Sequence, residues 1–347
     1  MNPNYILYAI PFFLLTLVGE LIHNYFKKGG KDFNFEDSIT NLNTGIGSQA
    51  VGALTKAVLL MGYSWVATNL AFIQWEFSIW SFLACLVFFD YIYYWAHRWG
   101  HEWNLFWGAH IVHHQSEEYN LTVALRQSWF HNLLAFPLFL PIPFLGFDTM
   151  TFAAAAGFVT LYQYWIHTKA IDHMPKWFEM IFNSPVHHRV HHAINTQYLD
   201  HNYGATFIIW DRLHGTYIDE EEEPVYGITK PLSSWNPVWA NFHFYIEMWE
   251  GSKRLKTLKE KLRLIFRGPE YLGNLLGQAT EVVSLKTVKK FRTETPFHLK
   301  LNSLLEITNA INNNFSREQL LKIFEFVLRS QLNIGRLLFY IKDDGWN

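Results

Sequence analysis

The stretch SPVHHRVHHAIN, from Ser184 to Asn195, contains four histidines among its twelve residues. His188, His191 and His192 are spaced i, i+3 and i+4, which on a helix places the three imidazoles on one face. A row of buried imidazoles without partners would lose hydration and gain nothing in return. Neutral imidazole is a good ligand for iron, zinc, copper and nickel. The segment therefore predicts a helix that presents histidines to a metal ion.

Two other segments repeat this pattern upstream. HRWGH places His97 and His101 at i and i+4, and HIVHH places His110, His113 and His114 at i, i+3 and i+4. The eight imidazoles of the three segments exceed what one ion of four to six ligands can bind. We therefore expect two metal ions. The single cysteine, Cys85, excludes both an internal disulfide and a thiolate cluster.

Further histidines extend the set. His167 follows an apolar segment and is an expected ligand; His187 is either a ligand or a hydrogen-bond partner of one. His173 and His201 are additional candidates, whereas His23, His131, His214, His243 and His298 are expected to be ordinary core or surface residues. The predicted metal ligands are His97, His101, His110, His113, His114, His167, His188, His191, His192 and His187.

The composition is that of a chain with much of its surface in lipid. Hydrophobic residues make up 50% of the 347 residues, and charged residues only 17%, against about 25% in soluble domains. The formal net charge of −2 gives no basic excess for binding nucleic acid. The apolar segment from Tyr5 to Ile22 has no basic region before it, and we expect a retained membrane anchor rather than a signal peptide.

Four more apolar segments are expected to enter the membrane. The fourth of the five is predicted to be a broken helix because it contains Pro137, Pro141 and Pro143. The fourth and fifth segments together form either two membrane crossings or a re-entrant hairpin. The four segments are residues 46–61, residues 77–97, residues 132–147 and residues 149–167.

The lysines of KKGGK, at positions 27, 28 and 31, predict a cytoplasmic end for the first span. Counting crossings from there brings both His97 and His167 out on the cytoplasmic face. The predicted fold class is all-α: an integral membrane bundle of four to five spans or re-entrant hairpins, with a cytoplasmic histidine-rich cap. We divide the chain into membrane helices (1–75), a catalytic core (76–230), a helical extension (231–296) and a tail (297–347).

Two segments near the C-terminus, residues 252–268 and residues 297–347, have patterns that fit more than one structure. SKRLKTLKEKLRLIFRG, from Ser252 to Gly268, is a basic helix that either packs one face on the body of the protein or lies on the membrane surface. The tail resembles the opening of a GAF-like α/β module cut off before its sheet is complete. A disordered or swapped tail would have the same pattern.

DYIYYWAHRWGHEWNLFWGAHIVHHQSEEYNLTVALRQS (Asp90 to Ser128), YWIHT (Tyr164 to Thr168) and HHRVHHAINTQYLDHNYGATFIIWDRLHGTY (His187 to Tyr217) resemble the fatty acid hydroxylase/sterol desaturase superfamily. Within it, the segments are most similar to the alkylglycerol monooxygenase branch. The resemblance implies a non-haem di-iron centre on the cytoplasmic face of a membrane bundle. It also implies that the boxed histidines and His167 are iron ligands. Related hydroxylases carry another histidine where this chain has Ile171, so the tenth ligand is His173, His187 or absent.

Two acidic residues are expected to support the centre. The resemblance implies that Glu102 is an acid on which the alkylglycerol enzymes depend, either as a ligand or as a partner of one. Asp90 lies about two helical turns before His97, where an unpaired acid at the edge of a span is unfavourable. We expect Asp90 to lock the helix or orient a ligand. The alternative is an ion pair with Arg98 or Arg126.

The resemblance implies O2-dependent hydroxylation or desaturation of a lipid. A histidine-held metal centre suits this activity, because breaking an unactivated C–H bond needs chemistry that side chains cannot supply. The resemblance favours cleavage of an alkylglycerol ether, with tetrahydrobiopterin as electron donor. The second hypothesis is a sterol desaturase, methyl oxidase or fatty acid hydroxylase that receives electrons from a separate cytochrome b5 or ferredoxin-type protein. A membrane metal-binding or transport protein is disfavoured, because a transporter places its ligands within the spans.

Overall fold

The computed structural model describes residues 4–28 and 33–277. The described residues belong to one compact unit; the expected tail, residues 297–347, lies outside them. The described part is all-helical, and its only β-type pairing is two isolated bridges, Phe182 with Phe207 and Ala193 with Tyr226. Its helices are α1 (Asn4–Lys28), α2 (Phe35–Asn69), α3 (Ile79–Glu102), α4 (Asn104–His114), α5 (Leu121–Leu125), α6 (His131–Ala135), η1 (Phe136–Phe139), α7 (Pro141–Phe144), α8 (Thr149–Trp165), α9 (Lys176–Ile181), α10 (Pro185–His191), η2 (Thr196–Tyr198), α11 (Ile209–His214), α12 (Pro237–Lys253), α13 (Leu258–Ile265) and α14 (Pro269–Leu276).

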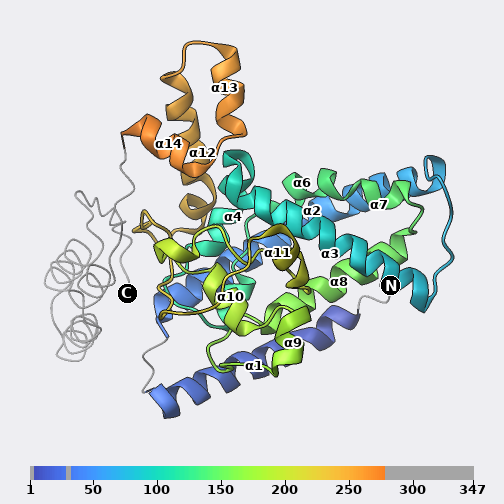
Figure 1. The fold of residues 1–347 in the computed structure, drawn as a ribbon, viewed down its shortest axis with the longest axis horizontal. Helices are drawn as coiled ribbons and strands as arrows, with labels where there is room; N and C mark the ends of the chain where they lie inside the picture. The colour runs from blue at the N-terminus through green and yellow to red at the C-terminus, as the bar shows by residue number, and fades with distance from the viewer. Residues whose placement is uncertain (1–3, 29–32, 278–347) are drawn as a thin grey trace, which may run out of the picture. The chain divides into compact units, whose positions relative to one another are not determined.

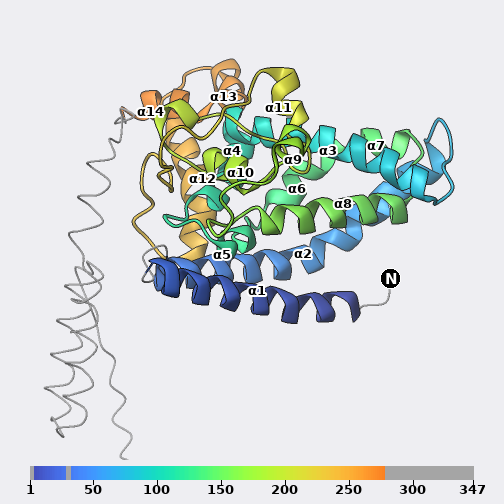
Figure 2. The ribbon, with the colours of Figure 1, turned by 60° about the horizontal axis from the view of Figure 1, so that its bottom comes forward.

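The long helices α1, α2, α3 and α8 run roughly along one direction (Figures 1 and 2). Within the described residues, two helices, α2 and α3, are long and apolar enough to cross a bilayer. Their outward faces carry exposed apolar side chains such as Leu54, Met61 and Trp80, which suits contact with lipid. The turn between α2 and α3 lies at one end of the bundle, and α4 lies toward the other (Figure 1).

Local signals fix where these helices begin. Ser78 and Ser81 form a reciprocal capping box at the start of α3, and Asp148 accepts the first backbone N–H groups of α8. The fourth apolar segment is broken into α6, η1 and α7, as its prolines predict. The residues expected as the fifth segment form α8, which is 17 residues long.

An aromatic core joins α2, α3, α8 and the broken segment. The rings of Phe89 and Phe139 stack at 4.6 Å, and those of Tyr63 and Phe152 stack at 4.2 Å. Gly45 allows α2 to approach α5 closely, since a Cβ there would overlap the carbonyl of Leu125. This packing holds the C-terminal ends of α3 and α8 beside α4 and α10, where the histidines lie.

The N-terminal part of α2 is buried through polar contacts instead. Asn41 donates to Ser116 and Thr122 and accepts from the guanidinium of Arg126, and Asp37 accepts from Ser116. All of these side chains are buried, and the hydrogen bonds offset the loss of hydration. The polar layer ties α2 to the segment that follows α4.

Candidate metal centre

Four parts of the chain bring nine histidines together. The last two turns of α3 carry His97 and His101, and the residue two positions after α8 is His167. α4 carries three and α10 two, with His192 directly after α10. α10 begins with Pro185 in its first turn, which suits a helix start because proline lacks the N–H that would remain unpaired there.

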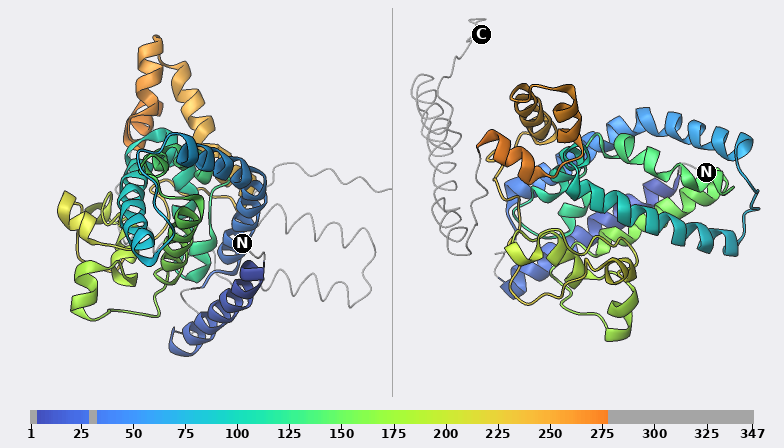
Figure 3. Two further views of the ribbon diagram at one scale, coloured as in Figure 1. Left: turned by 90° about the vertical axis from the view of Figure 1, so that its right-hand side faces the viewer. Right: turned by 45° about the horizontal axis from the view of Figure 1, so that its top comes forward.

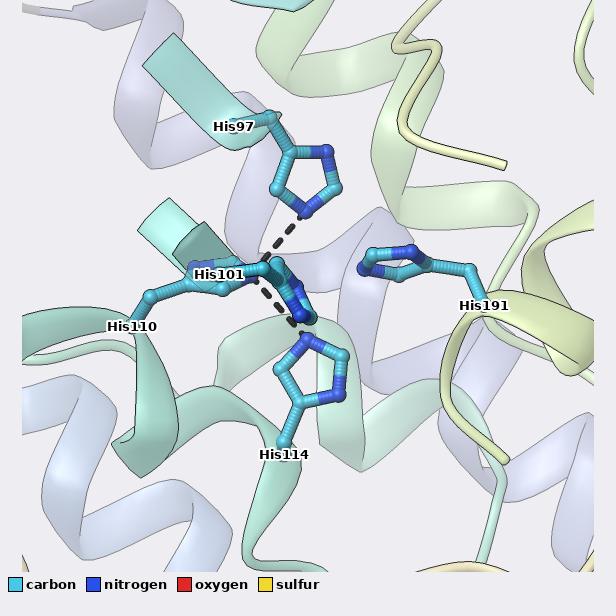
Figure 4. A group of neighbouring side chains, drawn as sticks. All are labelled: His97, His101, His110, His114 and His191. Atoms are coloured by element: carbon cyan, nitrogen blue, oxygen red, sulfur yellow. Dashed lines mark hydrogen bonds between the residues drawn. The ribbon is translucent and has the colours of Figure 1, made fainter. Parts of the chain in front are cut away.

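The nine side chains form two groups. His97, His101, His110, His114 and His191 make a five-histidine group, and His113, His167, His188 and His192 make a four-histidine group. Within each group one nitrogen of every ring lies within 4.8 Å of the others, and all nine residues are buried. Figure 4 shows the five rings converging from three helices, with His191 facing the other four.

The two groups are interleaved because α4 and α10 each contribute to both. On α4, His110 and His114 point to the five-histidine group, while His113 belongs to the other group. The rings of His114 and His192, one from each group, stack at 4.3 Å. Two ions held by these groups would therefore be close neighbours, as a two-metal site requires.

Backbone carbonyls fix the tautomer of four rings. The Nδ1 atoms of His97, His113, His167 and His191 lie 2.7, 3.0, 2.6 and 2.9 Å from backbone carbonyl oxygens. A carbonyl only accepts, so each Nδ1 carries the proton and each Nε2 presents a lone pair. The accepting carbonyls belong to Tyr203, Arg126, Gln163 and His201.

This tautomer leaves lone pairs facing each other. The Nε2 atoms of His113 and His167 are 3.1 Å apart, with no hydrogen available to either. His188 Nε2 lies 3.0 Å from His167 Nε2, while the Nε2 atoms of His101 and His191 are buried without a hydrogen-bond partner. Two neighbouring imidazoles at about 2.1 Å from one ion, at right angles, would place their nitrogens about 3.0 Å apart. The donor set therefore fits metal ions.

Burial keeps these rings neutral. It lowers the pKa of His113 to about 4 and that of His191 to about 3. Burial likewise lowers the pKa values of His110, His114, His167, His188 and His192. Metal binding needs the neutral imidazole, so the protein environment favours the form that binds.

Asp90 holds the loop that supports the five-histidine group. Its carboxylate accepts hydrogen bonds from the backbone N–H groups of Thr206 and Phe207, and from the indole N–H of Trp210. That loop includes Tyr203, whose carbonyl accepts from His97. Asp90 does not pair with an arginine: Arg98 pairs with Glu102, and Arg126 donates to Val112, Asn41 and Gln115.

Glu102 lies at the outer edge of the site. It forms an ion pair with Arg98 at 2.8 Å, and its side chain is 37% exposed. It is outside both histidine groups. Next to it along α3, His101 has its Nδ1 atom 3.7 Å from a carboxylate oxygen of Asp200.

The other histidine candidates lie outside both groups. His187 is buried and packs edge-on against Tyr217 at 5.6 Å. His173 lies near Glu179 on the surface, and His201 contributes its backbone carbonyl, which accepts from His191.

Two residues support the site in roles that the sequence does not indicate. Asp211 accepts from the backbone N–H groups of Tyr203 and Gly204, and so helps Asp90 to hold the same loop. Arg126 is buried, and its guanidinium binds the carbonyl of Val112 while its own carbonyl accepts from His113. Burial lowers the pKa of Arg126 to about 10, which still leaves it charged at neutral pH.

The part of the chain that carries the nine histidines matches a known protein family. Residues 82–216 match the family described as fatty acid hydroxylase. The chain is 33% identical to human alkylglycerol monooxygenase over 89% of its own length and 68% of that protein. It is 35% identical to alkylglycerol monooxygenase from Xenopus tropicalis, of which it spans 59%. It is 28% identical to a delta(7)-sterol 5(6)-desaturase from Schizosaccharomyces pombe, over 47% of this chain and 52% of that one. No solved structure matches the chain.

Proposed function

Because this chain belongs to the fatty acid hydroxylase family, we propose that it holds two iron ions and oxidises the ether bond of an alkylglycerol with O2. The observation that supports this most is the pair of adjacent histidine groups, whose fixed tautomers direct lone pairs at two points. The similarity to alkylglycerol monooxygenases extends over most of the chain, whereas the similarity to the fission-yeast sterol desaturase covers about half of it.

The proposed reaction inserts oxygen beside the ether bond. One oxygen atom of O2 enters the C–H bond next to the ether oxygen, and the other becomes water with two electrons and two protons from a donor. The product is a hemiacetal, which breaks its C–O bond to release an aldehyde and a glycerol hydroxyl group. A reduced pterin such as tetrahydrobiopterin is the proposed donor.

The iron ions, when bound, supply the activation of O2 that side chains cannot perform. The protein contributes geometry: the carbonyls of Tyr203, Arg126 and Gln163 hold ligand rings in place through Nδ1–H. The buried surroundings of the rings exclude water and protect against side reactions. Glu102, next to His101 and partly exposed, is the proposed acid at the edge of the site.

We propose that α2 and α3, which are long and apolar enough to cross a bilayer, hold this chemistry at a lipid surface. We propose that the centre faces the cytoplasm, on the basis of the lysines that end α1. A lipid substrate then reaches the centre from the bilayer, with its polar headgroup at the membrane–water interface.

The test is turnover by the purified full chain in detergent or nanodiscs. Iron-loaded protein with tetrahydrobiopterin should release a fatty aldehyde from a 1-O-alkylglycerol only when O2 is present. His113→Ala should abolish release, and His173→Ala, which changes an exposed histidine, should not. Iron-dependent hydroxylation or desaturation of a fatty acid or sterol, driven only by a protein electron donor and without ether cleavage, would support the second candidate instead.

A further inference from the structure

The segment formed by α12, α13 and α14 projects sideways from the bundle. Figure 1 shows it crosswise to the long helices, toward the end where α4 lies. Figure 3 (left), which looks along the long helices, shows it extending beyond their outline. We call residues 237–276 the arm. If the long helices cross a bilayer, an arm in this direction lies parallel to the membrane plane.

The arm is firmly attached to the helices that carry the metal centre. Leu264 and Leu272 are buried against Ile111 and Val112 of α4. Asn104, at the junction of α3 and α4, donates from its backbone to Arg267 O and from its side chain to Leu264 O. The inner face of α13 is therefore fixed, and only its outer face needs another partner.

The outer face of α13 is apolar and exposed. Leu258, Leu262 and Phe266 follow at intervals of four residues, and Leu258 is 73% exposed. They line a shallow groove of about 450 Å³ together with Lys259, Arg263 and Arg267. An exposed apolar stripe on a well-capped helix marks a surface that binds something.

Charge indicates what that partner is. Between Ser252 and Gly268 the sequence has seven basic residues and one acidic residue, Glu260. Lys259, Arg263 and Arg267 form a row on one side of the apolar stripe, and Lys261 lies on the other side. Long basic side chains can lay their stems on apolar surface and reach outward to anionic headgroups.

Aromatic side chains of the kind found at membrane interfaces lie beside the stripe. Trp99 and Trp103 stack at 4.9 Å where α3 ends, and Phe266 of the arm contacts Trp103 at 5.3 Å. Tryptophan gathers at the boundary between hydrocarbon and headgroups. Trp249, which is 65% exposed on α12, adds a further aromatic side chain to the arm.

We propose that α13 docks its Leu258–Leu262–Phe266 stripe on the anionic lipid surface of the membrane that holds the long helices, with its basic residues among the headgroups. The arm thereby fixes the depth of the α3–α4 junction, and with it the metal centre, relative to the lipid. The proposal depends on the long helices crossing a bilayer, and it does not depend on the lipid that is oxidised.

The test uses the full chain, one per nanodisc, with the buried Cys85 replaced (Cys85→Ala) and a polarity-sensitive dye on Leu262→Cys. In discs of phosphatidylcholine with phosphatidylserine, we expect blue-shifted emission and quenching by lipids that carry a nitroxide near the headgroup. Discs of phosphatidylcholine alone should give less quenching. The control dye, on Glu221→Cys in the acidic run, should remain water-exposed in both discs.

A second variant tests the charges. Lys259→Gln, Lys261→Gln and Arg263→Gln together should remove the difference between the two disc types while leaving iron content unchanged. The proposal is overturned if the dye at position 262 is water-exposed in both discs. Blue-shifted emission without quenching by the nitroxide lipids would also overturn it, because it would indicate a protein partner. So would equal quenching in the two disc types when the basic residues of the arm are unchanged.

Discussion

His113 and His167 direct their Nε2 atoms at each other across 3.1 Å, while the Nδ1–H of each ring is held by a backbone carbonyl. Both Nε2 atoms carry lone pairs, so no hydrogen bond can form between them. A shared cation makes this arrangement favourable. The two residues come from α4 and from the end of α8, so the contact also joins two helices that are far apart in the sequence.

Loss of either ring should therefore reduce metal binding at one group more than at the other. His167→Ala leaves three histidines in the four-histidine group and five in its neighbour. We expect iron content to fall from about two per chain to about one, measured by plasma mass spectrometry on purified protein. His173→Ala is the matched control and should retain both ions; equal loss in the two variants would contradict the assignment.

Asp90→Ala should destabilise the fold and weaken the five-histidine group. The substitution leaves the N–H groups of Thr206, Phe207 and Trp210 without their acceptor. A buried unpaired group costs about 1–3 kcal/mol. The Thr206 contact is buried and the other two are partly buried, so we expect a loss of about 2 kcal/mol or more. Thermal unfolding in detergent measures it. Asp90→Asn keeps an acceptor oxygen and should lose less; an unchanged unfolding midpoint for Asp90→Ala would rule out the locking role.

Glu102→Gln should separate catalysis from metal binding. Because Glu102 lies outside both histidine groups, iron content should not change. Its ion pair with Arg98 is partly exposed, so the effect on stability should be below about 1 kcal/mol. If Glu102 is the proposed acid, turnover should fall by about 100-fold or more. Loss of iron in this variant would instead indicate a ligand.

The metal-free protein should lose stability in mild acid. Burial lowers the folded-state pKa of His113 to about 4 and that of His191 to about 3, below the value of about 6.5 expected in the unfolded chain. At pH values between the folded-state and unfolded-state pKa values, the unfolded chain binds more protons than the folded chain. The free energy of unfolding therefore falls as the pH decreases from about 6.5. The unfolding temperature of chelator-treated protein between pH 7.5 and pH 5.5 measures this. The unfolding temperature should change less with pH in His113→Ala than in His173→Ala.

Local spacing explains why the histidine segments could be recognised in the sequence. The i, i+3, i+4 pattern puts His110, His113 and His114 on neighbouring parts of one helix face whatever the tertiary fold. The pattern does not say that His113 joins a different group from its neighbours. That division depends on how α4 packs against α10 and α8. The packing in turn depends on contacts between residues that are far apart in the sequence. The prolines of the fourth apolar segment acted locally too, and the break they predict is present.

The supporting contacts could not be predicted for the same reason. Four of the Nδ1 acceptors are backbone carbonyls, and a carbonyl has no residue type that marks it in a sequence. The sequence predicts that Asp90 locks a helix or orients a ligand, but its partners, in the segment from Thr206 to Trp210, are set by the path of a loop. The spacing likewise leaves open whether His187 or His173 is a ligand, and the structure has both outside the two histidine groups.

The most decisive measurement is the iron content of the purified, folded chain. We expect about two iron ions per chain after reconstitution, with X-ray absorption showing imidazole nitrogens as the main ligands. His113→Ala and His167→Ala, which each leave three histidines in the four-histidine group, should each remove about one ion. One ion or none in chain that is otherwise folded, or two ions that survive loss of His113 and His97 together, would contradict the two-group assignment.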